Sequence, residues 1–537
     1  MRQRSEMILA DLIQIRAEQK PELPVLTFEH LSLDDGATPD QVRSYADLHT
    51  HGNRIAAALI AKGVERGDRI AVMMRNHPEF VETAIACSIT GALYVPIDPR
   101  TRGDKLIYML GNSGCTGLVC ADYCLTELET VRGAVPDLRW VLAFETGEAE
   151  TPLSSFAGVE PLAEVLARPT ATLDVRVDDP TAPLQIMYTS GTTGDPKGIV
   201  GANFRFCAAS VLGTIFGYGP DERPYTGLSL THGNAQSVTL APALSMGLRA
   251  VLSRRFTKSK LWSVCRQYGC TSFSLVGGMA TAIYSQPARP DDDDNPVRMV
   301  VSGGMPAAIW EPFEKRFGVQ IFEFYGAMDG GGMAYKPVGE GPIGCFGKPM
   351  PGLEMKILDP DGNPCPPGAV GEICTRPAGG AEPVVEYYGN PEASTRKIRR
   401  GWNRSGDMGH ADEDGWLFFD YRAGGGIRHN GDFVNPSYVE KAIAEHPAVT
   451  DVFVYGVPAA SGAPGEKDVV AAVVLAASGD RDAASIFAAC RQRLEPNFVP
   501  SYLQLMDEIP KTASEKPQER LLLEQFAADT ANVYTEA

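Results

Sequence analysis

Apolar runs of strand length alternate with segments of helical periodicity in the first part of the chain, and this order limits the folds open to it. The segments Ala46–Lys62 and Glu79–Thr90 have helical periodicity, and they are followed by the apolar runs Ile70–Met74 and Ala92–Ile97. Because strands joined through helices run in the same direction, the alternation predicts a parallel sheet covered by helices.

The same alternation resumes further along the chain and predicts a second parallel sheet. Its apolar runs, each followed by glycine or polar residues, are Leu184–Tyr188, Arg249–Ser253, Thr271–Val276, Met299–Ser302 and Gln320–Tyr325. After Gly341 the pattern changes to short alternating strands separated by turn signals at Asp359–Pro364 and Asp412–Gly415. This part predicts a small antiparallel barrel or sheet.

Beyond the glycine run Gly424–Gly426 the chain has the pattern of a compact α+β unit. Helical periodicity at 437–446 and 483–494 alternates with apolar runs at 451–457 and 468–475. We therefore expect an α/β protein with a large domain, residues 1–421, and a small C-terminal domain, residues 422–537.

Composition excludes several classes of protein. A chain of 537 residues, 44% of them hydrophobic, is too large for a small binding module, and its net charge of -18 disfavours nucleic-acid phosphates and anionic lipid as partners. Charged residues interrupt the first twenty positions, so we expect no signal peptide, and no run is apolar enough to cross a bilayer. The 11 scattered cysteines indicate free thiols in a reducing cytoplasm, and the acidic run Asp291–Asp294 indicates a solvated loop.

The segment Tyr188–Gly198 carries the strongest chemical signal. It directly follows an apolar strand, its glycines let backbone N–H groups approach an anion, its hydroxyls donate hydrogen bonds, and Lys197 adds a positive charge. These features are typical of a loop that binds a polyphosphate. Pro196 precedes the lysine where the P-loop of many nucleoside triphosphatases needs glycine, so this is a different motif. The alternative interpretation is a polar surface turn.

This segment resembles the signature loop of the adenylate-forming superfamily, which contains acyl-CoA synthetases, peptide-synthetase adenylation domains and luciferases. Ser44–Leu48, Gly63–Asp68 and Gly91–Pro99 are similar to early segments of that family, and further matches extend to Lys516. Val499–Leu503 is also similar to the branch containing crotonobetaine/carnitine-CoA ligases. The resemblance implies two helix-covered, mainly parallel sheets and a small distorted antiparallel barrel in the large domain, followed by a small mobile C-terminal domain.

The resemblance also implies which residues bind ATP and AMP. Phe322–Asp329 is similar to the family's adenine-stacking segment, and Arg404–Asp407 to the segment whose aspartate binds the ribose hydroxyls. Taken without the resemblance, Gly303 and Gly304 fit a strand-to-helix turn equally well, and Asp407 and Arg422 fit surface ion pairs. The implied nucleotide contacts are Thr189, Ser190, Gly191, Thr192, Thr193, Gly194, Lys197, Gly303, Gly304, Glu323, Phe324, Tyr325, Gly326, Asp407, Arg422 and Lys516.

Asp329 and Thr189 are the magnesium ligands that the resemblance implies. The family usually has threonine and then glutamate where this chain has Met328 and Asp329, so the carboxylate is one methylene shorter. This departure leaves open a metal held through water, Glu323 as the alternative acid, and a site without an acid.

The acyl group is expected against a set of mostly small residues: His232, Gly277, Gly278, Gly303, Gly326 and Gly330. His232 matches a pocket-lining histidine or aromatic of the family, and a hydrogen-bonded structural histidine is the alternative. The loop at Gly431 is similar to the one that serves thioester formation. Gly424 and Gly425 replace the lysine and acid common at the family's hinge, and Glu515 replaces a glycine before Lys516.

These features predict an ATP-dependent carboxylic acid:CoA ligase that forms AMP. The carboxylate attacks the α-phosphorus, pyrophosphate leaves, and the acyl group passes from the adenylate to coenzyme A, with Lys516, Lys197 and His232 as catalytic residues. ATP, Mg²⁺ and coenzyme A are the expected cofactors; the acid stays unidentified and a homodimer stays open. The alternatives are a stand-alone adenylation enzyme that loads a carrier protein or an amine, and an inactive nucleotide-binding homologue, which Asp329, Gly425 and Glu515 suggest.

Overall fold

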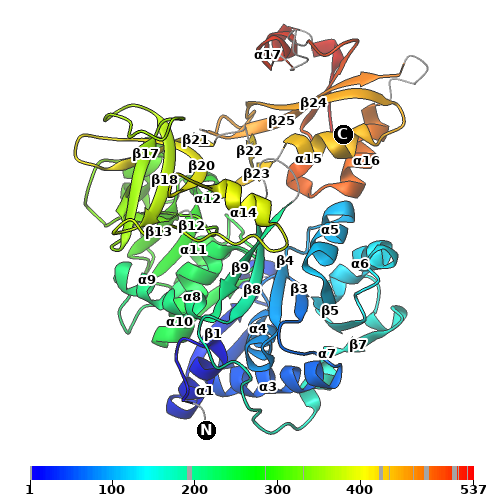
Figure 1. Ribbon diagram of the computed structural model, residues 1–537, viewed down its shortest axis with the longest axis vertical. Helices are drawn as coiled ribbons and strands as arrows, with labels where there is room; N and C mark the ends of the chain where they lie inside the picture. Colours follow the sequence, from blue (N-terminus) through cyan, green and yellow to red (C-terminus); the bar gives the residue numbers. More distant parts are fainter. Residues whose placement is uncertain are drawn as a thin grey trace. The chain divides into compact units, whose positions relative to one another are not determined.

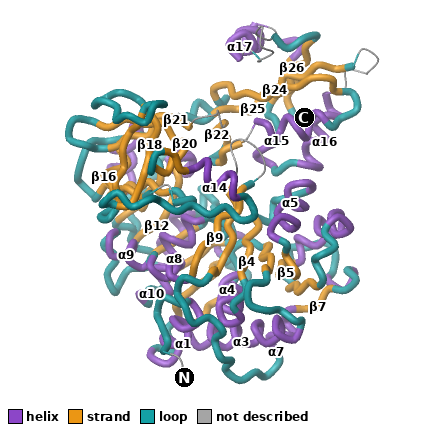
Figure 2. The backbone as a smooth tube through the Cα atoms, viewed as in Figure 1, coloured by secondary structure: helices purple, strands orange, loops and turns teal. Residues whose placement is uncertain are grey.

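The computed structural model of the protein describes residues 3–34, 36–189, 196–284, 286–330, 332–422, 427–434, 436–463, 465–476, 483–510, 517, 519–528 and 530–536 (Figures 1 and 2). The chain forms two compact units. The first comprises Met1–Pro99, Met109–Tyr188 and Lys197–Asp420, and the second comprises Arg100–Tyr108, Thr189–Pro196 and Tyr421–Ala537. The expected boundary between residues 421 and 422 stays a prediction.

The first predicted sheet is present in the first unit, in the strand order β7-β6-β5-β3-β4-β8-β9. Its strands are β3 (Arg69–Met73), β4 (Leu93–Ile97), β5 (Cys115–Ala121), β6 (Trp140–Phe144), β7 (Val159–Pro161), β8 (Pro183–Thr189) and β9 (Lys197–Ala202). The pairs that join β3 to β4 and β5, and β5 to β6, are parallel, as predicted. The run Leu184–Tyr188, expected in the second sheet, lies here because β8 pairs in parallel with β4.

Two helices between the early strands account for much of the apolar core. In α3 (Tyr45–Ala61) the Ser44 side chain accepts from the N–H of Asp47, and the Asp47 carboxylate accepts from the N–H of Ser44, which is a capping box. Every residue of α4 (Pro78–Thr90) is buried. The helices lie side by side (Figure 1), and a Cβ at Gly52 would stand 2.6 Å from Ile85 Cγ2. Glycine at position 52 therefore permits this close approach.

The second sheet joins parallel and antiparallel strands in the order β17-β18-β20-β21-β16-β15-β14-β13-β12-β10-β11-β1-β2. Its parallel part contains β1 (Pro24–Glu29), β10 (Pro224–Thr226), β11 (Ala250–Ser253), β12 (Ser272–Val276), β13 (Met299–Gly303) and β14 (Gln320–Gly326), and the antiparallel β2 (Gln41–Ser44) covers the edge of β1. The antiparallel strands at the other end are β15 (Met333–Lys336), β16 (Cys345–Pro349), β17 (Leu353–Leu358), β18 (Gly371–Pro377), β20 (Trp402–Ala411) and β21 (Leu417–Arg422). They continue the parallel sheet because β15 pairs antiparallel with β14, whereas the sequence suggested a separate element.

Helices that follow strands of the second sheet pack on it. They are the amphipathic α11 (Leu261–Tyr268) and α13 (Trp310–Phe317) and the more apolar α12 (Gly277–Tyr284). Trp310, Phe313 and Phe317 of α13 are buried in one apolar cluster with residues of β12, β13 and α11. The spacing of these aromatic residues at i, i+3 and i+7 is that of one helix face.

The second unit contains the α+β pattern that the sequence predicts. The order β24-β25-β26-β27 forms a sheet from β24 (Val449–Pro458), β25 (Lys467–Leu475), β26 (Tyr502–Met506) and β27 (Val533–Thr535). The helices α15 (Pro436–Ala444) and α16 (Ala483–Arg493) pack on it through Val439, Ile443, Ile486 and Phe487. A small hairpin of β22 (Ile427–His429) and β23 (Asp432–Val434) precedes them.

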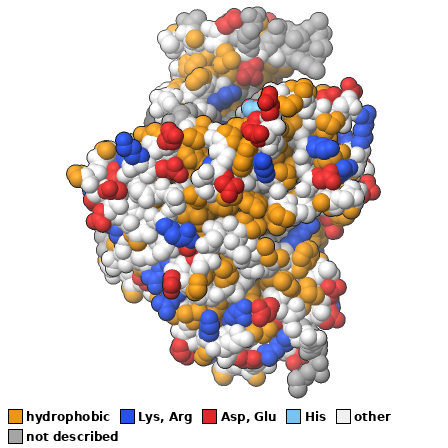
Figure 3. All heavy atoms as spheres, turned by 90° about the vertical axis from the view of Figure 1, so that its left-hand side faces the viewer, with side chains coloured by type: hydrophobic (Ala, Val, Ile, Leu, Met, Phe, Trp, Pro, Cys, Tyr) orange, Lys and Arg blue, Asp and Glu red, His pale blue; other side chains and the backbone are white. Residues whose placement is uncertain are grey.

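The first unit carries surface charges of both signs, and the thiols of the protein lie mainly in the interior. On the face drawn in Figure 3, acidic and basic side chains are interspersed with apolar ones over the first unit. All cysteines are free thiols, and all but the half-buried Cys365 are buried. Within the described ranges no helix has both the length and the apolar content that a membrane span requires.

We expect Gly347→Ala to destabilise the first unit by about 3 kcal/mol. Gly347 lies in β16 with φ +112°, and a Cβ there would overlap the carbonyl group of Tyr335 in the neighbouring β15, where only a backbone shift could relieve the clash. Urea unfolding measures the effect. The control is Gly352→Ala, which also has positive φ (+88°) but no atom within 4 Å of the added Cβ, and should cost about 1 kcal/mol. Equal losses in both variants would contradict the steric explanation.

Candidate active site

Most of the predicted site residues of the first unit lie at or just after the carboxyl ends of parallel strands. Gly303 ends β13, Gly326 ends β14, and Gly277 directly follows β12 as the first residue of α12. Thr189 is the last residue of β8. In α/β sheets this edge is where ligands bind, because the loops there are free to carry functional side chains. The topology therefore gathers segments that are far apart in the sequence.

Tyr325 and Asp407, predicted to contact adenine and ribose, are in direct contact. The Tyr325 hydroxyl donates to Asp407 Oδ2 at 2.6 Å, and the Tyr325 ring stacks on Phe346 with centroids 4.7 Å apart. Burial, together with the Asp407 carboxylate, raises the pKa of Tyr325 well above its usual range, so the phenol stays a donor. Asp407 itself is buried, and its N–H donates to Ser405 Oγ at 2.9 Å.

A chain of contacts continues from Ser405 to Lys197 through residues that no motif had indicated. Lys397, the last residue of α14 (Pro391–Lys397), donates to the Ser405 carbonyl at 3.2 Å and pairs with Asp329 Oδ2 at 2.6 Å. The Tyr387 hydroxyl donates to the same oxygen at 2.8 Å. Lys197 lies over the Tyr387 ring, 5.3 Å from its centroid. The network connects Lys197, Asp329, Asp407 and Tyr325 within one unit.

Lys197 is the first residue of β9 and is half-buried. Burial lowers its pKa, and the nearby cations Lys397 and Arg396 lower it further, while Asp329 acts in the opposite direction. Lys197, Lys397 and Arg396 thus bring positive charge close to the Asp329 carboxylate, and such a cluster of cations suits a phosphate group.

Glu323 has a structural role in this arrangement. Its carboxylate is buried and accepts hydrogen bonds from the N–H of Gly304 and from the N–H of Met305 at 3.1 Å. Gly304 has φ +99°, a conformation that favours glycine, so the carboxylate fixes a turn whose backbone other residues would strain. Both oxygens of Glu323 are thereby engaged by the backbone, and its alternative role as a magnesium ligand stays a prediction.

Asp329 fits poorly as a directly coordinating magnesium ligand. Its Oδ2 is already bound by Lys397 and Tyr387, and the Lys397 ammonium supplies the compensating charge that a cation would supply. The Thr189 side chain lies outside the described residues. Within the described ranges, no cluster of three or more His, Cys, Asp or Glu side chains is arranged to hold a metal ion.

His232 lies at the border of the predicted acyl region. Its side chain is 57% exposed, and its Nε2 is 3.9 Å from Oδ2 of Asp98, which follows β4. The neighbouring Gly233 is in close contact with Met328, since a Cβ at position 233 would overlap the Met328 sulfur. The segment of His232 therefore lies beside the segment that carries Asp329. Gly330 and Gly332 have positive φ and complete that segment's turn.

Several predicted residues cannot be placed in this arrangement. Ser190, Gly191, Thr192, Thr193, Gly194 and Lys516, together with the departures Gly424, Gly425 and Glu515, lie outside the described residues. Arg422 ends β21, but its side chain is also outside the description. In the second unit Gly431 occupies the turn of the β22–β23 hairpin with φ +85°, and its N–H lies 3.4 Å from Glu466 Oε2.

Two protein-family models match this chain over most of its length. A model of the AMP-binding enzyme family matches residues 13–383, and a model of the AMP-binding enzyme C-terminal domain matches residues 438–516. A crotonobetaine/carnitine–CoA ligase of Salmonella paratyphi A is 30% identical over 88% of this chain and 91% of its own. The medium/long-chain-fatty-acid–CoA ligase FadD17 of Mycobacterium marinum is 30% identical over 91% of this chain and 92% of its own.

Solved structures share the fold at lower sequence identity. An o-succinylbenzoate CoA synthetase of Bacillus subtilis superposes with a TM-score of 0.78 and 24% identity, covering 98% of this chain and 99% of its own. The amide bond synthetase McbA of Marinactinospora thermotolerans gives 0.74 and 23%, covering 90% and 95%. One fold thus accommodates different acyl acceptors, and fold alone does not identify the acceptor.

We expect Glu323→Gln to change how stability depends on pH. Burial raises the pKa of Glu323 from 4.5 to about 7 against the opposing effect of its backbone donors. The folded protein therefore holds a proton that the unfolded chain releases, and wild-type stability falls as pH rises from about 4.5 to about 7, by on the order of 3 kcal/mol. The variant lacks this decline, which urea unfolding at pH 5 and pH 8 measures. The exposed Glu311→Gln is the control, and parallel pH profiles of wild type and Glu323→Gln would contradict the assignment.

Proposed function

The chain belongs to the AMP-binding enzyme family and is an adenylate-forming acid–thiol ligase of the acyl-CoA synthetase kind, and from this premise we propose how its own residues carry out the reaction. The observation that supports the proposal is the connected network of Tyr325, Asp407, Asp329 and Lys197. It joins residues suited to a purine, a ribose and a phosphate in the order in which ATP carries these groups.

Tyr325 and Asp407 form the nucleoside end of the proposed site. Phe346 supports one face of the Tyr325 ring, which leaves the other face for the adenine. A carboxylate can accept from both ribose hydroxyls at once, and Asp407 is proposed to bind them in this way. Gly303 and Gly304 allow the nucleotide to approach the backbone that Glu323 fixes.

Lys197 and the Thr189–Gly194 loop form the proposed phosphate end. The substrate carboxylate attacks the α-phosphorus, the bond to the bridging oxygen breaks, and pyrophosphate leaves with the charge that Lys197 and the loop hold. Lys516 is proposed to bind the reacting oxygens of the carboxylate and α-phosphate. The thiol of coenzyme A then attacks the acyl carbon and displaces AMP. Gly431 is proposed to border the path of this thiol.

ATP is proposed to enter as its magnesium complex, with the metal bound to the phosphates. Because Asp329 is engaged by Lys397, we propose that the Asp329–Lys397 pair contacts the complex in place of a carboxylate that coordinates the metal directly. Lys397 thereby contributes a fixed positive charge near the phosphates. His232 and its neighbours are proposed to bound the acyl group.

The acid is proposed to be of the kind for which the two relatives described above are named, namely crotonobetaine, carnitine and medium to long fatty acids. The test is pyrophosphate release from ATP with each of these acids, followed by thioester formation with free coenzyme A, a carrier-protein thiol or an amine. Release followed by a CoA thioester is the expected result. Release with transfer only to a carrier or an amine supports the stand-alone adenylation enzyme, and ATP binding without release on any acid supports the inactive homologue.

We expect Lys516→Ala to lower adenylation by roughly two to three orders of magnitude, because a fixed cation at the reacting oxygens acts mainly in the transition state. The rate of pyrophosphate release measures this step, and thioester formation from a supplied acyl-adenylate should change much less. The neighbouring Lys511→Ala is the control and should keep nearly full activity. A loss confined to thioester formation would contradict the assignment of Lys516.

We expect Lys397→Met to make ATP binding depend more strongly on magnesium than it does in the wild type. Without its lysine, Asp329 presents an uncompensated carboxylate to the phosphates, so ATP binding in EDTA should weaken by about tenfold or more, and Mg²⁺ should restore most of it. Calorimetry with a non-hydrolysable ATP analogue, with and without Mg²⁺, measures the affinities. The double variant Lys397→Met/Asp329→Asn should lose this dependence, and the exposed Lys315→Met is the control. Identical magnesium dependence in wild type and Lys397→Met would contradict the proposed role.

A further inference from the structure

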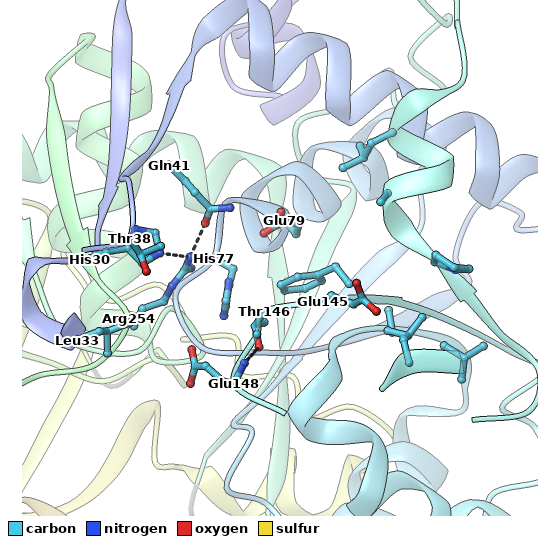
Figure 4. Close-up of a pocket in the computed structure, with 18 of the residues that line it drawn as sticks. His30, Leu33, Thr38, Gln41, His77, Glu79, Glu145, Thr146, Glu148 and Arg254 are labelled. Atoms are coloured by element: carbon cyan, nitrogen blue, oxygen red, sulfur yellow. Dashed lines mark hydrogen bonds between the residues drawn. The ribbon is translucent and has the colours of Figure 1, made fainter. Parts of the chain in front are cut away.

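A second region of the first unit has the properties of a binding site, and it involves none of the residues discussed above. A cavity of about 1070 Å³ lies where β1, β3, β6 and β11 end, and residues that directly follow β1, β6 and β11 line it, namely His30, Glu145 and Arg254 (Figure 4). In the second sheet, β11 and β1 stand apart from β13 and β14, with β12 and β10 between them. The carboxyl edges of parallel strands are the usual place for ligands.

The cavity contains a buried cation that forms no ion pair with the described residues. Arg254 is 5% exposed. Its guanidinium donates to the Asn76 carbonyl, to the Gln41 side chain and to His30 Nε2 at 3.0 Å, and Figure 4 shows it reaching between His30 and Gln41. All three acceptors are neutral, and among the residues described no carboxylate forms an ion pair with Arg254. Burial lowers the pKa of Arg254, and the charges of Glu79 and other acidic groups oppose this by raising it.

Such a cation is energetically costly. A buried charge without a partner loses its hydration, and the penalty in proteins amounts to several kcal/mol. The hydrogen bonds to neutral acceptors offset only part of that penalty, because bonds between ionised groups are roughly twice as strong. A guanidinium has five N–H groups, so the three bonds leave donors for an anion that enters the cavity.

The wall beside Arg254 presents further donors at the start of α4. The Tyr123 hydroxyl accepts from the N–H of Arg75 at 2.8 Å and forms a hydrogen bond with His77 Nε2 at 3.1 Å. Burial lowers the pKa of His77 to about 2, so the ring is neutral and one of its two nitrogens carries a hydrogen. The side chain of His77 does not cap α4, which leaves backbone N–H groups of the first turn without that partner.

Glu79 adds a buried carboxyl that is only partly engaged, since its Oε1 lies 4.0 Å from the Arg43 guanidinium. It lines the cavity, it is 6% exposed, and its Oε2 has no hydrogen-bond partner among the described residues. Burial and the neighbouring Glu82 raise its pKa to about 7, so at lower pH it is a neutral carboxyl that can donate. Together with Arg254 and His77 it makes this wall rich in donors.

The remaining lining restricts the ligand further. The other walls contain the apolar side chains of Phe144, Leu153, Phe156 and Leu166, which suit a hydrocarbon body. The rim carries Glu145 and Glu148, the latter paired with Arg75. These carboxylates disfavour a ligand with several negative charges, so a single carboxylate on an apolar body matches the cavity better than a phosphate does.

We propose that this cavity binds a small monocarboxylate, with its carboxylate against Arg254 and its hydrocarbon part against Phe144 and Phe156. The site is separate from the catalytic residues proposed above and does not depend on them. The expected binding can therefore be tested in the full-length protein whether or not the protein proves to activate acids.

The test is calorimetric titration of the protein with hexanoate. The comparison ligand is 1-hexanol, which has the same six-carbon chain but carries no charge. Hexanoate should bind, and hexanol should bind at least about tenfold more weakly because it cannot pair with the guanidinium. Arg254→Gln should weaken hexanoate by a similar factor. Equal affinities for hexanoate and hexanol, or for wild type and a folded Arg254→Gln, would overturn the proposal.

A second pair of variants keeps the test independent of the folding of Arg254→Gln. Ala163, an exposed residue of α7 (Leu162–Ala167), lines the cavity, so Ala163→Trp should fill it and weaken hexanoate binding by about tenfold or more. The neighbouring exposed Glu164→Trp does not line the cavity and should bind as wild type does. Unchanged binding in both tryptophan variants would show that hexanoate binds elsewhere, and would overturn the proposal.

Discussion

The ion pair between Asp329 and Lys397 is the interaction on which the nucleotide region depends. It joins the turn after β14, where the sheet changes from parallel to antiparallel, to the end of α14, and Lys397 continues the connection to Ser405 in β20. Both side chains are largely shielded from water, so removal of either partner leaves a charge that the interior cannot solvate. Tyr325, Asp407 and Lys197 are held in one network because this pair, with Tyr387, links their three segments.

Periodicity predicted the elements of the fold better than their assembly. The segments Ile70–Met74, Ala92–Ile97 and Gln320–Tyr325 correspond to the strands β3, β4 and β14. They were predictable because a short apolar run between helical segments is typical of a buried strand. Partner choice was harder to predict. Leu184–Tyr188 pairs with β4, and the antiparallel strands extend the second sheet through β15, since pairing depends on edges that only the folded sheet presents.

The sequence indicated candidate site residues only where it carries a motif. Tyr325 and Asp407 were predicted from their segments, and in the structure the Tyr325 hydroxyl lies 2.6 Å from Asp407 Oδ2. Lys397 and Tyr387 lie in a helix and a loop with no distinctive spacing, and a lysine at the end of a helix is ordinarily explained by the helix dipole. Only the fold shows that Lys397 reaches Asp329. Arg254 was not predicted from the sequence for the same reason, because only the folded structure shows which side chains lie beside an arginine.

The buried and half-buried cations of this protein must bind anions against the negative charge of the chain as a whole. With a net charge of -18, the protein as a whole repels ATP and acids at long range, although salt screens this repulsion beyond about 8 Å at physiological ionic strength. Attraction must therefore come from donors close to the ligand and shielded from solvent. Half-buried Lys197 and largely shielded Lys397 meet that condition for phosphates, and Arg254 meets it in the cavity at the ends of β1 and β11. An acidic chain with such sites should select anions by fit at short range, with little contribution from electrostatic steering.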